Sequence, residues 1–198
     1  MSVYSVLMAR AKSEDKRNAI LSAATEVFAE RGLAAATSAI SHAAGVAEGT
    51  LFTYFNTKDE LINALYRAIK LELADAMMSD FPRRAGLRTR LQHVWDRYAG
   101  WGVANPLQHK ALQQIVVWSG LTEESKCAGV APFREIEKMA QDAVAQHLFL
   151  DRPLEFIAAT LSAMADTTIE FMRRTPKQAE MYRNAGFEML WAAIARKK

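Results

Sequence analysis

Apolar residues recur at helical spacing along almost the whole chain. A typical stretch places Ile20, Leu21, Ala24, Val27 and Phe28 three and four residues apart, on one face of a helix. No run alternates β-branched and polar residues between turn signals, as a half-buried strand would. The pattern therefore predicts an all-α fold.

Capping and breaking residues divide the first part of the chain into helices. Ser13, followed by two acidic residues, predicts the start of a helix that ends before Gly32. Thr37 or Ser38 is expected to cap a short second helix, and a third short helix is expected over about 47–55. Two short helices joined by a glycine-containing turn, behind a longer helix, predict a helix-turn-helix over 37–56.

The fourth helix has the clearest start signal. Thr57 and Glu60 form a capping box, and Leu61, Leu65 and Ile69 continue as an apolar stripe. Proline- and glycine-containing breaks separate later helices, which are expected over about 87–103, 107–119, 132–150, 154–174 and 177–196.

Spacing also divides the helix-turn-helix into two faces. The inward face is expected to hold Ile40, Ala44, Val46, Leu51 and Phe55. The outward, polar face is expected to hold Ser41, His42, Glu48, Thr50, Thr53 and Tyr54. Such a set of hydrogen-bonding groups on a short helix suits a reader of DNA base edges and phosphates.

Composition and charge narrow the class without deciding it. The 198 residues are 51% hydrophobic and 24% charged, with a net charge of +3, which fits a globular protein and is compatible with a polyanionic partner. The single cysteine, Cys127, cannot form an internal disulfide. Neither an export signal nor a membrane span is evident, so a cytoplasmic protein is expected.

Signs of an enzyme are missing from the sequence. The four histidines lie far apart without metal-ligand spacing, and there is no phosphate loop, nucleophile elbow or pair of catalytic acids. We therefore expect no catalytic residue, no metal site and no cofactor.

The segment 37–61 resembles the signature of the TetR family of regulators. Its sequence is TSAISHAAGVAEGTLFTYFNTKDEL, and upstream Ala23-Ala24 and the run from Phe28 to Gly32 match the family as well. Within the family, the chain from Met8 onward is similar to the RamR-type multidrug-sensing repressors of efflux genes, including around Trp95.

The resemblance implies two domains, with a DNA-binding domain over 8–60 and a ligand-binding and dimerisation domain over 61–198. The implied DNA-binding residues are Thr37, Ser38, Ala47, Glu48, Gly49, Thr50, Phe52, Thr53, Tyr54 and Lys58. Gly49 would let the helix backbone approach DNA, Thr50 and Thr53 would lie near base edges or phosphates, and Thr37, Tyr54 and Lys58 would hold phosphates.

Two positions depart from the family pattern. Ala47 and Phe52 stand where family members often have serine and tyrosine, and each lacks a hydroxyl that could bind phosphate. A basic stretch is our hypothesis for what compensates, and it comprises Arg10, Lys12, Lys16 and Arg17.

The resemblance also implies a ligand cavity in the second domain. Tyr66 and Trp95 are its first candidate lining residues, followed by Tyr98, Leu112 and Leu161, although an aromatic stripe is more often ordinary core. A cationic ligand could be balanced by Asp166 or Glu170, with a plain solvated helix face over Glu155, Ser162, Asp166 and Arg173 as the alternative.

The last two helices carry apolar residues on both sides, which predicts a partner. These residues are Phe156, Ile157, Leu161, Met164, Phe187, Leu190, Trp191 and Ile194. By resemblance the partner is the same helix pair of a second subunit, giving a homodimer, and the alternative is a core within one chain.

The combined prediction is a transcriptional repressor that small, aromatic or cationic ligands release from operator DNA. It would control efflux or multidrug-response genes. An architectural DNA-binding protein without a ligand, an activator, and an enzyme with an aromatic cavity are the competing classes.

Overall fold

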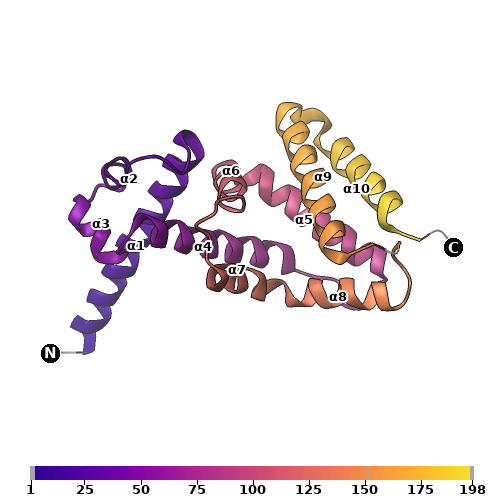
Figure 1. Cartoon of the computed structure of the whole chain (residues 1–198), viewed down its shortest axis with the longest axis horizontal. Coiled ribbons are helices and arrows are strands. Elements are labelled where there is room, and N and C mark those ends of the chain that lie inside the picture. Colours follow the sequence, from indigo (N-terminus) through magenta and orange to yellow (C-terminus); the bar gives the residue numbers. More distant parts are fainter. Residues whose placement is uncertain (1–2, 151, 197–198) are drawn as a thin grey trace. The chain divides into compact units, whose positions relative to one another are not determined.

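The computed structural model describes residues 3–150 and 152–196, with side chains from residue 12 onward. Within these residues the fold is all-α, as predicted (Figure 1). The helices run in the order α1 (Val3–Arg31), α2 (Thr37–Ala43), α3 (Glu48–Tyr54), α4 (Lys58–Met78), α5 (Leu87–Ala104), α6 (Pro106–Ile115), α7 (Glu123–Val130), α8 (Arg134–Ala145), α9 (Leu154–Arg174) and α10 (Ala179–Ile194). Short 3₁₀ turns, Ala131–Phe133 and Pro176–Gln178, precede α8 and α10.

The chain folds into two compact units. One comprises the residues up to Ile69 together with Leu107–Gly129, and the other comprises Lys70–Pro106 and the residues from Val130 onward. Residues 107–129 thus pack with the N-terminal segment, whereas the sequence analysis grouped them with the C-terminal domain. A functional boundary at residue 60 stays a prediction.

In the first unit, α1 supplies the main apolar face. Ile20, Ala24 and Phe28 are completely buried, as the spacing of apolar residues indicated. The expected start at Ser13 is wrong, because α1 already begins at Val3 and continues through Ser13. The preceding leucine, methionine and alanine residues are good helix formers, and their propensity outweighs the capping signal.

The end of α1 is the predicted glycine cap. Gly32 has φ +82°, and its backbone N–H donates to the carbonyl of Phe28 at 3.0 Å. The turn between α2 and α3 also contains a glycine with positive φ. Gly45, just after the end of α2, has φ +64°.

The capping box at α4 is confirmed with one difference. The N–H of Glu60 donates to Oγ1 of Thr57 at 3.0 Å, as expected. The carboxylate of Glu60 accepts the backbone N–H of Asn56 at 2.9 Å instead of that of Thr57. The bonds still satisfy donors at the start of α4, which continues to Met78.

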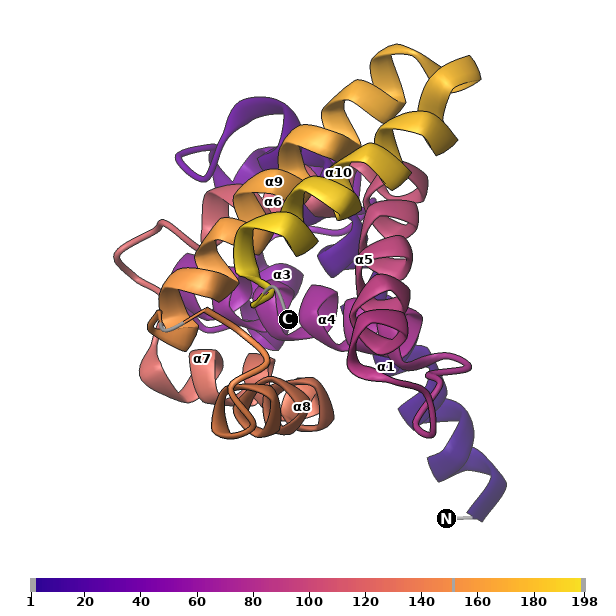
Figure 2. The same ribbon diagram turned by 90° about the vertical axis from the view of Figure 1, so that its right-hand side faces the viewer.

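The second unit is built around a close approach of α5 and α9. A Cβ added to Gly102 would lie 2.5 Å from Cδ1 of Ile169, so a larger residue would force the Ile169 side chain to move. Ala99 and Ile169 are fully buried beside Met172. Helix α10 lies beside α9 in this unit (Figure 2), and Gly186 of α10 gives room to the ring of Trp95.

Helix α7 was missed by the sequence analysis, which also extended α6 past its end at Ile115. The start of α7 is capped, because Oγ1 of Thr122 accepts the N–H of Ser125 at 3.2 Å. Two glutamates occupy its first turn. These caps were readable, but α7 has only a short apolar stripe, and periodicity gave little sign of it.

No described helix is long and apolar enough to cross a bilayer. Outside the helices, Phe149 and Ala195 form an isolated antiparallel bridge.

Candidate functional site

Helices α2 and α3 are anchored by three buried side chains. Ile40 and Leu51 are completely buried and Phe55 is 2% exposed, and α2 packs against α1 while α3 packs against α2. Helices this short are unstable alone, so this anchoring fixes which side of α3 faces outward.

All ten predicted DNA-binding residues remain accessible. Those at the surface are Ser38, Ala47, Glu48, Gly49, Phe52 and Thr53. Those half-buried are Thr37, Thr50, Tyr54 and Lys58. Their contacts with DNA stay predictions, but the fold leaves each of them a free surface.

Thr37 is tied to the third helix. Its hydroxyl donates to Oε1 of Glu48 at 2.7 Å, while Ala36 takes the N-cap position of α2 without a side-chain bond. The expectation that Thr37 or Ser38 caps α2 is therefore wrong. For the Thr37 hydroxyl to donate to a phosphate, it must first leave the carboxylate of Glu48.

Gly49 lies on the surface with open space around it. A Cβ placed there would meet nothing within 4 Å, and its φ is not positive. Neither packing nor backbone conformation requires a glycine at this position. A close approach of the α3 backbone to another molecule would explain it.

One predicted outward residue is buried. Ser41 is 4% exposed, and its hydroxyl donates to the carbonyl of Ser38 at 3.1 Å. Ser41 can face inward because this bond within α2 satisfies its hydroxyl. The predicted inward residues Ala44 and Val46 are only half-buried.

Basic residues of α1 add positive charge to this unit. Lys12, Lys16 and Arg17 are exposed, and the guanidinium of Arg17 lies 5.3 Å from the ring centroid of Phe55. The side chain of Arg10 lies outside the described residues. Whether this stretch compensates for the hydroxyls missing at Ala47 and Phe52 stays a prediction.

The five predicted ligand-lining residues are distributed over both units. Tyr66 and Leu112 are buried in the first unit. The ring of Tyr66 lies so close to Gly129 that an added Cβ there would be 2.4 Å from it. Burial raises the pKa of the Tyr66 hydroxyl, and nearby Lys126 partly opposes the shift.

In the second unit, Trp95 and Tyr98 have defined internal partners. Trp95 is completely buried, and its indole N–H donates to the carbonyl of Arg183 at 2.8 Å. The Tyr98 hydroxyl donates to Oδ1 of Asp166 at 3.1 Å, and burial, then the charge of Asp166, raises its pKa. Leu161 is half-buried. A shared cavity for the five residues stays a prediction.

The alternative that one face of α9 is simply solvated is wrong at two of its four residues. Asp166 accepts the Tyr98 hydrogen bond, and the guanidinium of Arg173 donates to the carbonyl of Gly102. Glu155 and Ser162 are exposed, as that alternative expected. Glu170 pairs with Arg174 at 3.6 Å on the surface.

The sequence of the first unit matches a known family. Residues 20–65 match the family model described as bacterial regulatory proteins, tetR family. A fatty acid metabolism regulator protein of Bacillus subtilis is 31% identical over 80 residues, which are 40% of this chain and 41% of that protein. The alignment thus spans less than half of either protein.

Solved structures extend the likeness to nearly the whole chain. A protein from Shewanella sp. PV-4, described as a TetR family transcription regulator, superposes with a TM-score of 0.83 at 25% identity, over 92% of this chain and 99% of that one. The chain has the fold of the TetR regulators.

Two further proteins with the TetR fold were solved with ligands. LfrR of Mycobacterium smegmatis, in complex with proflavine, has a TM-score of 0.66 at 19% identity, over 92% of this chain and 99% of that one. FadR of Bacillus subtilis, in complex with stearoyl-CoA, has a TM-score of 0.65 at 18% identity, over 87% of this chain and 96% of that one. The finer similarity to RamR-type multidrug sensors stays a prediction.

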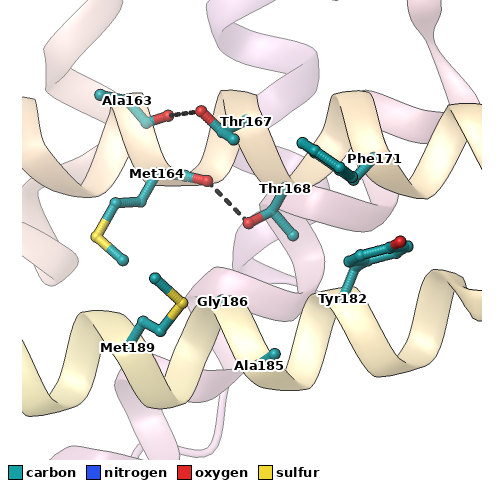
Figure 3. A pocket seen from close by; sticks show the side chains of 9 residues that line it. All are labelled: Ala163, Met164, Thr167, Thr168, Phe171, Tyr182, Ala185, Gly186 and Met189. Atoms are coloured by element: carbon teal, nitrogen blue, oxygen red, sulfur yellow. Dashed lines mark hydrogen bonds between the residues drawn. The ribbon is translucent and has the colours of Figure 1, made fainter.

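On the surface of this TetR fold, α9 and α10 enclose an apolar groove. The α9–α10 groove has a volume of about 370 Å³ and lies between the side chains drawn in Figure 3. Its lining residues are Ala163, Met164, Thr167, Thr168, Phe171, Tyr182, Ala185, Gly186 and Met189. None of the five predicted ligand-lining residues belongs to it.

The structure divides the apolar residues of these helices between core and surface, and the dimer interface stays a prediction. Four of the eight predicted residues, Ile157, Phe187, Leu190 and Ile194, are buried within the unit. The exposed large apolar side chains of α9 and α10 are Phe156, Phe171, Met181 and Met189. Helical spacing could not show which apolar face remains outside, because both faces carry apolar residues.

Lys70 of α4 is a charged residue that the sequence analysis missed. Its ammonium lies 4.2 Å from the ring centroid of Phe133, and burial lowers its pKa from 10.5 to about 8. No cluster of three or more metal-binding side chains occurs among the described residues. The sequence signal for Lys70 was its place next to Ile69 on the otherwise apolar stripe of α4.

Proposed function

We propose that this chain is a dimeric transcriptional repressor that binds operator DNA through α2 and α3 and is released by a small-molecule effector. The observation that carries the proposal is the exposed face of α3, with open backbone at Gly49 and anchoring residues on its other side. The match to the tetR family model covers these same residues.

At the DNA, each predicted residue takes a role that its exposure permits. Gly49 allows the backbone of α3 to lie close to the edge of the major groove, and Thr50 and Thr53 reach bases or phosphates. The Thr53 hydroxyl donates to the carbonyl of Gly49 at 3.0 Å, so as it stands it can accept from a base amino group, and it must rotate away from Gly49 to donate to a phosphate. Lys58, at the start of α4, supplies a phosphate contact together with Thr37 and Tyr54.

A second copy of the chain would cover the α9–α10 groove. Phe171 and Met189 line it and are 39% and 65% exposed, and Ala163 and Ala185 are small enough for two helices to approach closely. Two such helix pairs would make a four-helix interface with two-fold symmetry. A symmetric dimer would offer two copies of α3 to the half-sites of a palindromic operator.

The effector would act through α4. Its first residues belong to the first unit and its last residues belong to the second, so it is one continuous helix shared by both. An effector that shifts α4 changes the position of the DNA-binding helices, with a coupling of about 1–3 kcal/mol that acts equally in both directions.

We propose aromatic or cationic compounds as effectors, with contacts to Tyr66, Trp95, Tyr98, Leu112 and Leu161. The proflavine complex of LfrR supports this ligand class, since proflavine is a flat aromatic cation. The stearoyl-CoA complex of FadR favours a fatty acyl ligand as the other candidate. Control of efflux or multidrug-response genes is part of the proposal for the first class.

The test is selection of palindromic DNA from random sequence, followed by fluorescence anisotropy with the full chain. Proflavine, which also binds DNA, is expected to bind the chain in the absence of DNA and to lower its affinity for the selected DNA, whereas stearoyl-CoA should leave that affinity unchanged. Release by stearoyl-CoA alone would replace the drug-sensing proposal with an acyl sensor. Selective binding that no compound weakens would contradict the proposal of a small-molecule effector. If no sequence is selected, the repressor proposal is wrong.

A reporter assay separates repressor from activator. With the selected operator between promoter and reporter, the chain is expected to reduce expression, and addition of the releasing compound should restore it. Increased expression from operators placed upstream of the promoter would identify an activator. Affinity that is equal for all sequences would identify an architectural protein.

A further inference from the structure

A second pocket of the C-terminal unit lies away from the α9–α10 groove. It has a volume of about 650 Å³, within the range of small-molecule sites. We call it the Trp191 pocket, and its lining residues are Gly86, Leu87, Arg88, Thr89, Gln146, His147, Leu148, Trp191 and Arg196. The N-terminal turn of α5, the segment after α8 and the end of α10 thus meet there.

Backbone hydrogen bonds hold the pocket open in a defined shape. The N–H of Arg196 donates to the carbonyl of Leu148 at 2.9 Å, and the N–H of Leu150 donates to the carbonyl of Ile194 at 2.8 Å. These two bonds join the end of the chain to the segment after α8. Because these hydrogen bonds already order the backbone around the pocket, little conformational entropy is lost when a ligand binds there.

The pocket combines an apolar wall with positive charge. Trp191, Leu87 and Leu148 contribute apolar surface. The guanidinium of Arg88 lies 5.7 Å from the ring centroid of Trp191 and pairs with Glu188, so its charge is compensated. Arg196 makes no side-chain hydrogen bond or ion pair with the described residues, and none of the described residues that line the pocket carries a carboxylate.

The N-terminal turn of α5 adds to the positive potential. Its N-cap is Gly86, and no side chain caps the helix. Backbone N–H groups and the helix dipole favour an anion there. Arg196, Trp191 and this turn therefore suit a ligand with one negative charge and one flat apolar part.

We infer that the Trp191 pocket binds a small aromatic carboxylate, with the carboxylate at Arg196 and the ring against Trp191. The inference is independent of DNA binding and of the effector proposed for α4. It concerns a separate pocket, which none of the predicted ligand-lining residues enters.

Gly86 offers a test that leaves the fold intact. Its φ of −63° suits any residue, and a Cβ placed there meets nothing within 4 Å. Serine and aspartate are both good N-caps, so Gly86→Ser and Gly86→Asp should fold at least as well as the unmodified chain. Only aspartate puts a negative charge into the pocket.

The measurement is isothermal titration calorimetry of the full chain with 2-naphthoate, and with 2-naphthamide as the neutral analogue. The amide is expected to bind at least tenfold more weakly than the carboxylate. Gly86→Asp should weaken naphthoate binding at least tenfold relative to Gly86→Ser. Arg196→Gln should do the same relative to Arg134→Gln, which removes an exposed arginine outside the pocket.

Three results would overturn the inference. One is equal affinity for naphthoate and naphthamide, and another is naphthoate binding that Gly86→Asp and Arg196→Gln leave unchanged, which would place the ligand elsewhere. The third is no measurable binding of naphthoate at millimolar concentration. Because no DNA is present, none of these results bears on the repressor proposal.

Discussion

The α2–α3 region and the α9–α10 region present opposite kinds of surface. Helices α2 and α3 have seven residues each and offer mainly small and polar side chains to solvent, with Phe52 as the one large apolar side chain exposed on them and open backbone at Gly49. Helices α9 and α10 have 21 and 16 residues, and they expose large apolar side chains around a groove. One surface suits a polar, charged partner such as DNA, and the other suits an apolar partner such as a second copy.

The difference shows how each surface is determined. Around α3, the short helices and their turn are defined by local residues, and a few buried side chains fix the outward face. Around α9 and α10, apolar residues lie on all sides, and packing with α5 decides which remain outside. The predictions below test this contrast, beginning with the largest expected effect.

Charge placed in the α9–α10 groove should separate the two copies. Ala163→Glu puts a carboxylate on the proposed interface, where burying it unpaired should weaken dimerisation by about 100-fold or more. Operator affinity should fall with it, because one α3 per molecule reads only a half-site. Analytical ultracentrifugation and anisotropy measure both.

Ser162→Glu is the matched control for this variant, since Ser162 is exposed on α9 but does not line the groove. It should leave dimerisation unchanged. A dimer that tolerates Ala163→Glu would show that the groove is not the interface.

Replacing each of two helical glycines with alanine should change the stability of the protein in opposite directions. Gly102→Ala forces a methyl group against Ile169 and should cost about 1–3 kcal/mol of folding free energy. Gly49→Ala meets open space, so stability should stay the same or rise by up to about 1 kcal/mol. DNA affinity should nevertheless fall about tenfold for Gly49→Ala, because the added methyl group enters the proposed contact.

Urea unfolding and anisotropy on both variants check this pair. If Gly49→Ala binds the operator as tightly as the unmodified chain, Gly49 does not contact DNA. A normal stability of Gly102→Ala would show that α5 and α9 can move apart without cost.

Lys70 should make the stability of the second unit depend on pH. Its pKa in the folded state, about 8, lies below the ordinary 10.5, so the fold holds the charged form at a cost. That cost is complete below pH 8, decreases between pH 8 and 10.5, and is absent above. Lys70→Met should therefore stabilise the protein by about 1–3 kcal/mol at pH 7.

Urea unfolding between pH 7 and 10.5 measures this difference, which should shrink as the pH rises. Lys138→Met, at an exposed position of α8, is the control and should show no such trend. A gain for Lys70→Met that is constant with pH would mean that methionine packs better for reasons other than charge.

The smallest expected effect concerns the basic residues of α1. Lys16→Gln removes one exposed cation and should weaken binding several-fold for all DNA sequences alike. The slope of log affinity against log salt should decrease by about 1 if Lys16 contacts one phosphate. An unchanged slope would show that Lys16 lies away from the DNA.

The features that the sequence could predict are those determined by local residues, as around α2 and α3. The all-α class, the capping box at Thr57 and the anchoring residues Ile40, Leu51 and Phe55 were all predictable, because caps and short-range spacing determine them. Motif resemblance also located the α2–α3 region, which the family model matches.

Features set by tertiary packing could not be predicted in the same way. Trp95 is buried against Gly186 of α10, and Ser41 is buried although its hydroxyl bonds only within its own helix. The exposure of Met181 and Met189 depends on which face of α10 packs inward. A linear pattern marks such residues as apolar or polar but does not say what lies opposite them.

The central claim is that α2 and α3 read a specific DNA sequence. Its most direct test is the ratio of affinities of the full chain for the selected palindrome and for a scrambled duplex of equal length, at physiological salt. The account predicts a ratio of about 10³ or more. Equal affinities for the two duplexes would contradict it.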